Sequence, residues 1–138
     1  MSAKNTPAAQ IAADEAAELE LEQAIGTYAL AVSGDLASVS GCLQYGLPYD
    51  GALHYEFAMH LPTVGEDLAI DPALSGQERM LAVYAAVLDR LGGIPAGKID
   101  AALLAAHLSA ADFDALYFAQ ELLLKKRRRP TAGANATA

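Results

Sequence analysis

The stretch from Leu61 to Arg129 most constrains the fold, because each expected helix in it carries its own start and stop signals. Ser75 and Glu78 have the S-x-x-E spacing of a capping box, in which each side chain pairs with a free backbone N–H at the helix start. The glycines and proline within 92–95 supply a stop, after an apolar stripe formed by Met80, Leu81, Tyr84, Val87, Leu88 and Leu91. The pattern predicts a helix over 75–91.

Two further helices are expected before the end of this stretch. Asp100 can cap a short helix that turns three leucines inward, at Leu103, Leu104 and Leu108. Ser109 with Asp112 resembles a weaker cap and predicts a last helix that runs to about Arg128. Its apolar stripe comprises Phe113, Leu116, Tyr117, Leu123 and Leu124. The bases at its end complement the negative pole of the helix dipole.

The clearest strand precedes these helices, over 53–61. Apolar and polar residues alternate there with a period of two, so that Tyr55, Phe57, Met59 and Leu61 oppose His54, Glu56, Ala58 and His60. We expect the polar face to meet solvent. Pro62 ends the strand, and 66–70 is expected to be a second strand or a helical turn, with a short hairpin as the simplest arrangement. Residues 27–32 are a candidate strand, and 34–50 are expected to be mostly loop.

The chain of 138 residues has the size of one ordinary domain. Residues 1–25 are rich in Ala and Glu, and their loose apolar stripe predicts a marginal helix or mobile arm, docked on a partner or free. Residues 26–129 are expected to form a single α+β domain, in which a small hairpin or sheet precedes a three-helix unit. Residues 130–138 follow as a disordered tail of small residues.

Charge and composition exclude several classes of protein. The net charge is −8, and without the five bases at 125–129 the chain would be more acidic still. Such a body repels nucleic acid and anionic membranes. No window has the roughly 18 apolar residues of a membrane span, and no secretory signal is recognisable, so a cytoplasmic protein is expected. Cys42 is the single cysteine and is expected to be a semi-buried or loop thiol.

Candidate chemical groups do not converge in the sequence. His54, Glu56 and His60 share one strand face, but the two histidines lie about 20 Å apart along an extended strand. Glu66, Asp67 and Asp71 are expected to lie in a solvated loop, since no second carboxylate or histidine element is placed to join them. Gly-rich phosphate loops and a nucleophile elbow are also absent from the sequence. We therefore expect neither an enzyme nor a bound cofactor or metal.

The basic run at 125–129 permits three interpretations. It can bind nucleic acid, contact an acidic partner, or complement the helix dipole and keep the tail soluble. Specific DNA recognition is not expected, because Asp112 and Asp114 place negative charge in the leading turn of the last helix.

A family resemblance runs over residues 47–126. Residues 47–70 read LPYDGALHYEFAMHLPTVGEDLAI, and residues 90–126 read RLGGIPAGKIDAALLAAHLSAADFDALYFAQELLLKK. Together they resemble the tail assembly chaperones of contractile-tailed phages of the Mu and P2 type. The recognisable pieces are the strand running into 61–65, the break at 91–95 and the helix opening at 112–116. The first 45 residues carry no part of the resemblance.

The resemblance implies a non-enzymatic phage or prophage protein in the cytoplasm of the bacterial host. Such a protein would bind the tape-measure protein, and also the tail-tube protein, while the tail assembles, and it would need no cofactor. Self-association is compatible with this role. The physical chemistry agrees, because an unassembled tape measure exposes apolar helical surface that a small domain with an aliphatic groove could cover.

Candidate partner-binding residues lie on the helices and on the basic run. They are Tyr84, Phe113, Tyr117 and Leu124, with Lys125, Lys126, Arg127, Arg128 and Arg129. The four apolar candidates also fit a core, because stripe residues usually pack inward. The alternative interpretation of the chain is an acidic adaptor or regulatory module of prophage origin, also without enzymatic activity.

Overall fold

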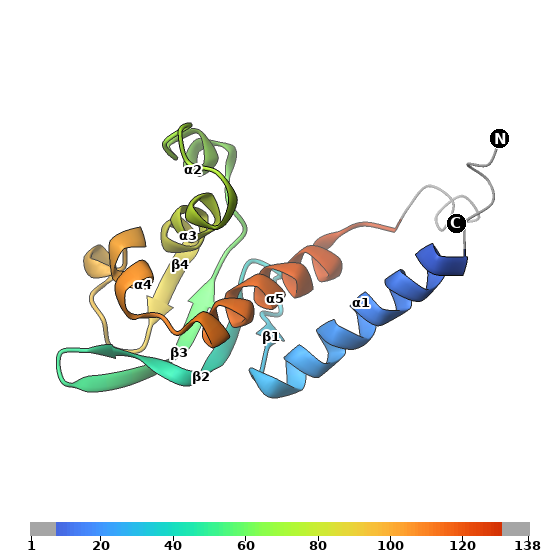
Figure 1. The fold of residues 1–138 in the computed structure, drawn as a ribbon, viewed down its shortest axis with the longest axis horizontal. Helices are drawn as coiled ribbons and strands as arrows, with labels where there is room; N and C mark the ends of the chain where they lie inside the picture. Colours follow the sequence, from blue (N-terminus) through green and yellow to red (C-terminus); the bar gives the residue numbers. More distant parts are fainter. Residues whose placement is uncertain (1–7, 131–138) are drawn as a thin grey trace.

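The protein has an α+β fold in which one four-stranded antiparallel sheet is covered by helices. We describe residues 8–130 of a computed structural model (Figure 1). The sheet has the order β1-β2-β3-β4 and is formed by β1 (Ala31–Val32), β2 (Val39–Tyr49), β3 (Ala52–Met59) and β4 (Leu88–Leu91). The helices are α1 (Ala8–Thr27), α2 (Val64–Leu68), α3 (Gly76–Val87), η2 (Ala96–Lys98, a 3-10 turn), α4 (Ala101–His107) and α5 (Ala110–Arg127).

The predicted strand over 53–61 is confirmed, but its hairpin partner is β2. The reversal uses Asp50 and Gly51, both with positive φ, and Tyr49 pairs with Ala52 across it. This is the backbone twist that two-residue hairpins favour. The sequence prediction of a loop over 34–50 is therefore wrong, as is the hairpin with 66–70, where α2 forms. The candidate strand at 27–32 is reduced to β1, because α1 continues to Thr27.

An irregular bulge of several residues interrupts β2. Cys42 pairs with Glu56 and Leu47 pairs with His54, so the four residues at 43–46 stand opposite Tyr55 alone. Bulges of this kind kink the strand and leave backbone groups unpaired. Here the free N–H groups are satisfied by a residue from far along the chain, the buried Asp112 at the start of α5.

The helix predicted over 75–91 is shorter than expected. It ends at Val87, and the next four residues form β4, which pairs with β3 at the sheet edge. Leu88 and Leu91, which continued the helical stripe in the sequence, are buried from this strand instead. The predicted capping box is also wrong, because the Ser75 side chain makes no cap hydrogen bond although the residue occupies the N-cap position.

Helices α4 and α5 confirm the sequence predictions more closely. The Asp100 side chain accepts the N–H of Leu103 at the start of α4, and the Ser109 hydroxyl accepts the N–H of Ala111 at the start of α5. The predicted marginal helix at the N-terminus exists as α1, although residues 1–7 of the predicted segment lie outside the described residues. Of the predicted tail only Pro130 lies within them.

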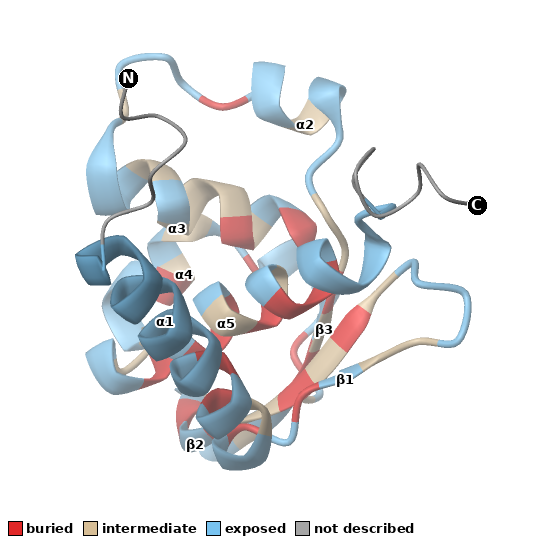
Figure 2. Ribbon diagram, turned by 90° about the vertical axis from the view of Figure 1, so that its right-hand side faces the viewer, coloured by how far each residue is buried: buried red, intermediate tan, exposed pale blue. Residues whose placement is uncertain are grey.

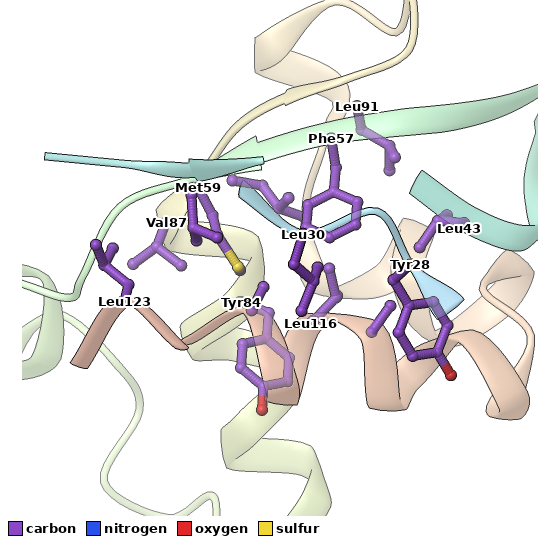
Figure 3. Packing of buried hydrophobic residues seen from close by; sticks show 14 of the residues in the cluster. Tyr28, Leu30, Leu43, Phe57, Met59, Tyr84, Val87, Leu91, Leu116 and Leu123 are labelled. Carbon is purple, nitrogen blue, oxygen red and sulfur yellow. The ribbon is translucent and has the colours of Figure 1, made fainter. Parts of the chain in front are cut away.

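The core lies between the sheet and helices α3 and α5. Leu30, Leu43, Phe57 and Met59 meet Tyr84, Val87, Leu116 and Leu123 there (Figure 3). Burial is continuous along α5 but reaches only Leu21 and Ala24 on α1 (Figure 2). Because α1 contacts chiefly α5, it covers the body from outside and adds little to the core.

Candidate functional site

A groove of about 520 Å³ runs between α1 and α5. The two helices lie side by side, and α5 also packs along the sheet (Figure 1). Just after α1, the Tyr28 hydroxyl donates to the carbonyl of Ala111 near the start of α5, at 3.4 Å. Near the end of α5, Lys125 lies 3.7 Å from Glu18. The helices are therefore antiparallel, and the groove runs between residues 14–21 of α1 and 117–128 of α5.

The floor and rim of the groove carry apolar side chains. Leu21 is buried at the floor and Phe118 is half-buried beside it, whereas Tyr117 and Leu124 remain 43% and 41% exposed. The rings of Tyr117 and Phe118 meet edge to face, with centroids 5.1 Å apart. Exposed apolar side chains that converge on one concave surface are typical of interaction sites.

The charged side chains of the groove are mostly acidic. Asp14, Glu18 and Glu20 come from α1 and Glu121 comes from α5, against the two bases Lys125 and Arg128. Lys125 is engaged by Glu18, and within residues 8–130 Asp14, Glu20 and Glu121 form no ion pair. The groove thus combines an apolar floor with a rim whose acids are only partly neutralised.

The candidate partner-binding residues from the sequence separate into three groups: four line the groove, two pack in or against the core, and three basic residues lie outside both. Tyr117, Leu124, Lys125 and Arg128 all line the groove. Tyr84 lies in the core with 1% of its surface exposed, and Phe113 is half-buried against it at a ring distance of 5.4 Å. Burial raises the pKa of Tyr84 to about 12. Its place in the core makes Tyr84 a packing residue, as the alternative interpretation allowed.

The basic run ends α5 and lies at the outer end of the groove. Lys125, Lys126 and Arg127 occupy the last helical turn, where they complement the dipole, and Arg128 is the C-cap. All five side chains from Lys125 to Arg129 are exposed, but only Lys125 and Arg128 line the groove. The side chains of Lys126, Arg127 and Arg129 therefore lie on the exposed surface outside the groove lining.

His54 in β3 and His60 just after it both have structural partners. His54 accepts the backbone N–H of Gly93 at 3.0 Å, so the strand face expected to meet solvent is partly covered by the turn after β4. His60 lies 2.9 Å from Asp89 and 2.9 Å from Glu66, and the carboxylate of Glu66 also accepts the N–H of Thr63. In the part of the chain that is described, no group of three or more His, Cys, Asp or Glu residues could hold a metal ion.

Sequence reasoning missed one whole wall of the groove. The α1 residues Asp14, Ala17, Glu18, Glu20 and Leu21 follow no strong apolar stripe, and only Leu21 among them is buried. The usable signal was the absence of Gly and Pro from Ala8 to Ile25, which favours one continuous helix. Which helix α1 packs against is decided by contacts about a hundred residues away, which no local pattern reveals.

Comparison with protein-family models, with curated proteins and with solved structures gave no match. Among residues 8–130, no helix is both long enough and apolar enough to cross a bilayer. The groove is therefore interpreted from its own geometry and chemistry.

Proposed function

We propose that this protein is a phage or prophage tail assembly chaperone that covers helical segments of the tape-measure protein in the groove between α1 and α5. The observation that carries the proposal is the convergence of exposed Tyr117 and Leu124 with buried Leu21 in one open groove. Apolar grooves between helices accept the apolar face of a further helix. The resemblance over residues 47–126 supports the choice of partner. The resemblance, and the lack of converging chemical groups in the sequence, favour a binding protein over an enzyme.

Partners and location follow from this role. The tape-measure protein is the main partner, the tail-tube protein is a second one, and both would be met in the cytoplasm of the bacterial host. No cofactor, specific nucleic acid or membrane is part of the proposal. The acidic rim supports this restriction, because an acidic surface repels the phosphates of nucleic acids and of anionic lipids.

Co-expression with a tape-measure protein tests the proposal, which expects the tape-measure gene to lie near the gene for this chain. We expect more soluble tape measure and a complex that co-purifies. Replacing Tyr117 and Leu124 together with Asp should abolish both effects, because charge on the groove rim opposes burial of an apolar helix. The matched control replaces Val64 and Leu68 with Asp, since these side chains are 77% and 78% exposed on α2, outside the groove.

The control variant should behave as the unmodified protein. If the solubility of the tape measure is unchanged by the unmodified chain and no complex forms, the chaperone function is wrong. If the control variant loses binding as completely as the groove variant, the groove is not the binding surface.

A further inference from the structure

The shape of the groove restricts the kind of chain that can occupy it. On the α5 wall the lining runs from Tyr117 to Arg128, a length of about 17 Å or three helical turns. Both walls are helices whose backbone groups are already paired within each helix, so neither offers the sheet edge that an extended peptide needs. A helical occupant brings its own backbone hydrogen bonds and presents only side chains.

The charges of the groove restrict the occupant further. Asp14 and Glu18 share the outer part with Lys125 and Arg128, because the antiparallel packing sets the start of α1 against the end of α5. Glu20 and Glu121 lie further from that end, on opposite walls, and the described residues provide no ion pair for either. An apolar helix with bases beside its stripe would place positive charge at these two carboxylates.

We infer that the groove selects an amphipathic helix whose apolar stripe is flanked by Lys or Arg. The stripe packs on Leu21, Tyr117 and Leu124, and the flanking bases meet Glu20 and Glu121. This inference rests on the proposed function for the existence of a helical partner, and it adds the charge of that partner. Complementary rim charges mainly set selectivity and association rate, so the charge on the helix should decide which helices bind.

Two synthetic peptides of about three heptads test the inference. Both carry Leu at positions a and d, one has Lys at e and g, and the other has Glu there. Like charges at e and g keep each peptide from self-association. Fluorescence anisotropy at about 50 mM salt should show the Lys peptide binding at least about tenfold more tightly than the Glu peptide. Near 0.5 M salt the difference should shrink, because the Debye length falls below about 5 Å.

Matched charge reversals localise the effect. The variant E20K/E121K should lose or invert the preference for the Lys peptide. The control E15K/E22K makes the same change in net charge at exposed residues of α1 that do not line the groove, and it should keep the preference. Circular dichroism checks that each variant is folded. The comparison of the two peptides on the unmodified protein does not depend on the folding of any variant.

Three results would overturn the inference. These are equal or tighter binding of the Glu peptide, no binding of either peptide, and an equal loss of preference in both double variants. The third would assign the preference to the net charge of the molecule. Should any of them occur while the tape-measure protein still co-purifies, the charge selectivity fails and the chaperone function stands.

Discussion

Asp112 joins two parts of the chain that are distant in sequence. One carboxylate oxygen accepts the N–H of Gln44 at 2.8 Å, and the other accepts the N–H groups of Tyr45 and Gly46 at 3.0 Å each. The side chain is fully buried in the first turn of α5, where the helix dipole also favours a negative charge. Asp112 therefore fixes the bulge of β2 against the helix, and the sequence interpretation of it as a weak cap understated its role.

Replacing Asp112 with Ala should strongly destabilise the protein. Three backbone N–H groups would lose their acceptor, and we expect the free energy of unfolding to fall by about 3 kcal/mol. Urea unfolding followed by circular dichroism measures the change. D114A is the matched control, because Asp114 lies two residues along the same helix and is exposed. Similar losses in both variants would contradict the role assigned to the buried carboxylate.

Adjacent glycines after β4 offer a second test at the scale of one residue. Gly92 has φ +56°, and a Cβ atom there would lie under 3.0 Å from the His54 side chain. At Gly93 a Cβ atom would meet the same ring at an ordinary 3.7 Å. We expect G92A to lower the free energy of unfolding by about 2 kcal/mol, through both strain and steric overlap. In urea unfolding G93A should lose clearly less, and equal losses would show that the ring approach does not matter.

At the scale of elements, local signals predicted what local contacts decide. The caps at Asp100 and Ser109 and the alternation in β3 were sufficient for α4, α5 and one strand. Long-range contacts decided the rest. Leu88 to Leu91 leave the helical pattern because β3 offers an edge to pair with, and the bulge of β2 depends on Asp112. The groove was only half predictable for the same reason, because the α5 wall has a clear stripe and the α1 wall has none.

The capping signals show the same limit at a finer level. Ser75 and Glu78 have the right spacing, yet the box forms at Thr63 and Glu66, where both reciprocal hydrogen bonds are present. Glu66 is also held by His60, which gives its carboxylate a second reason to stay near the start of α2. The spacing of the residues alone cannot distinguish these two candidate capping boxes. The additional contact that holds Glu66 comes from His60, just after β3, and so lies outside the helix and its cap.

The link between α2 and β4 through His60 predicts a dependence on pH. Burial of the ring opposes protonation, but hydrogen bonds to Glu66 and Asp89 outweigh it and raise the pKa of His60 above 6.5. The hydrogen bond from the Thr63 N–H, followed by that from His60, lowers the pKa of Glu66 below 4.5. The His60 contribution is thus complete below about pH 6.5 and is lost as the pH rises through the raised value. The Glu66 contribution is present above about pH 4.5 and is lost in acid.

Substitution of His60 with Gln should therefore cost more stability at about pH 5.5 than at about pH 8.5. The pair of interactions is partly exposed, so we expect a loss of roughly 1 kcal/mol at the lower pH and less at the higher. Urea unfolding at both pH values measures the difference. H107Q serves as the control, because His107 is an exposed histidine of α4 for which the described residues provide no ion pair. A loss of equal size at both pH values would argue against the charged link.

At the scale of the whole molecule, α5 packs along the sheet and α1 lies beside α5, with the start of α1 next to the end of α5 (Figure 1). Every side chain from Ala8 to Glu20 is exposed, so this half of α1 contributes little burial to the fold. It nevertheless supplies Asp14, Ala17, Glu18 and Glu20 to the groove. A segment that binds without stabilising can be removed without unfolding the rest, and this separates the two roles experimentally.

A chain that begins at Leu19 should keep its fold and bind its partner less tightly. We expect its free energy of unfolding to change by less than about 1 kcal/mol, because the removed residues that are described bury no side chain. Its affinity for the Lys peptide should fall at least about tenfold, because Asp14, Ala17 and Glu18 are gone from the groove. A chain that begins at Ala8 keeps every lining residue that the structure describes and should bind as the full chain does. If the chain from Leu19 is unfolded, α1 is a structural element of the body, and if it binds normally, the part of α1 before Leu19 does not contact the bound helix.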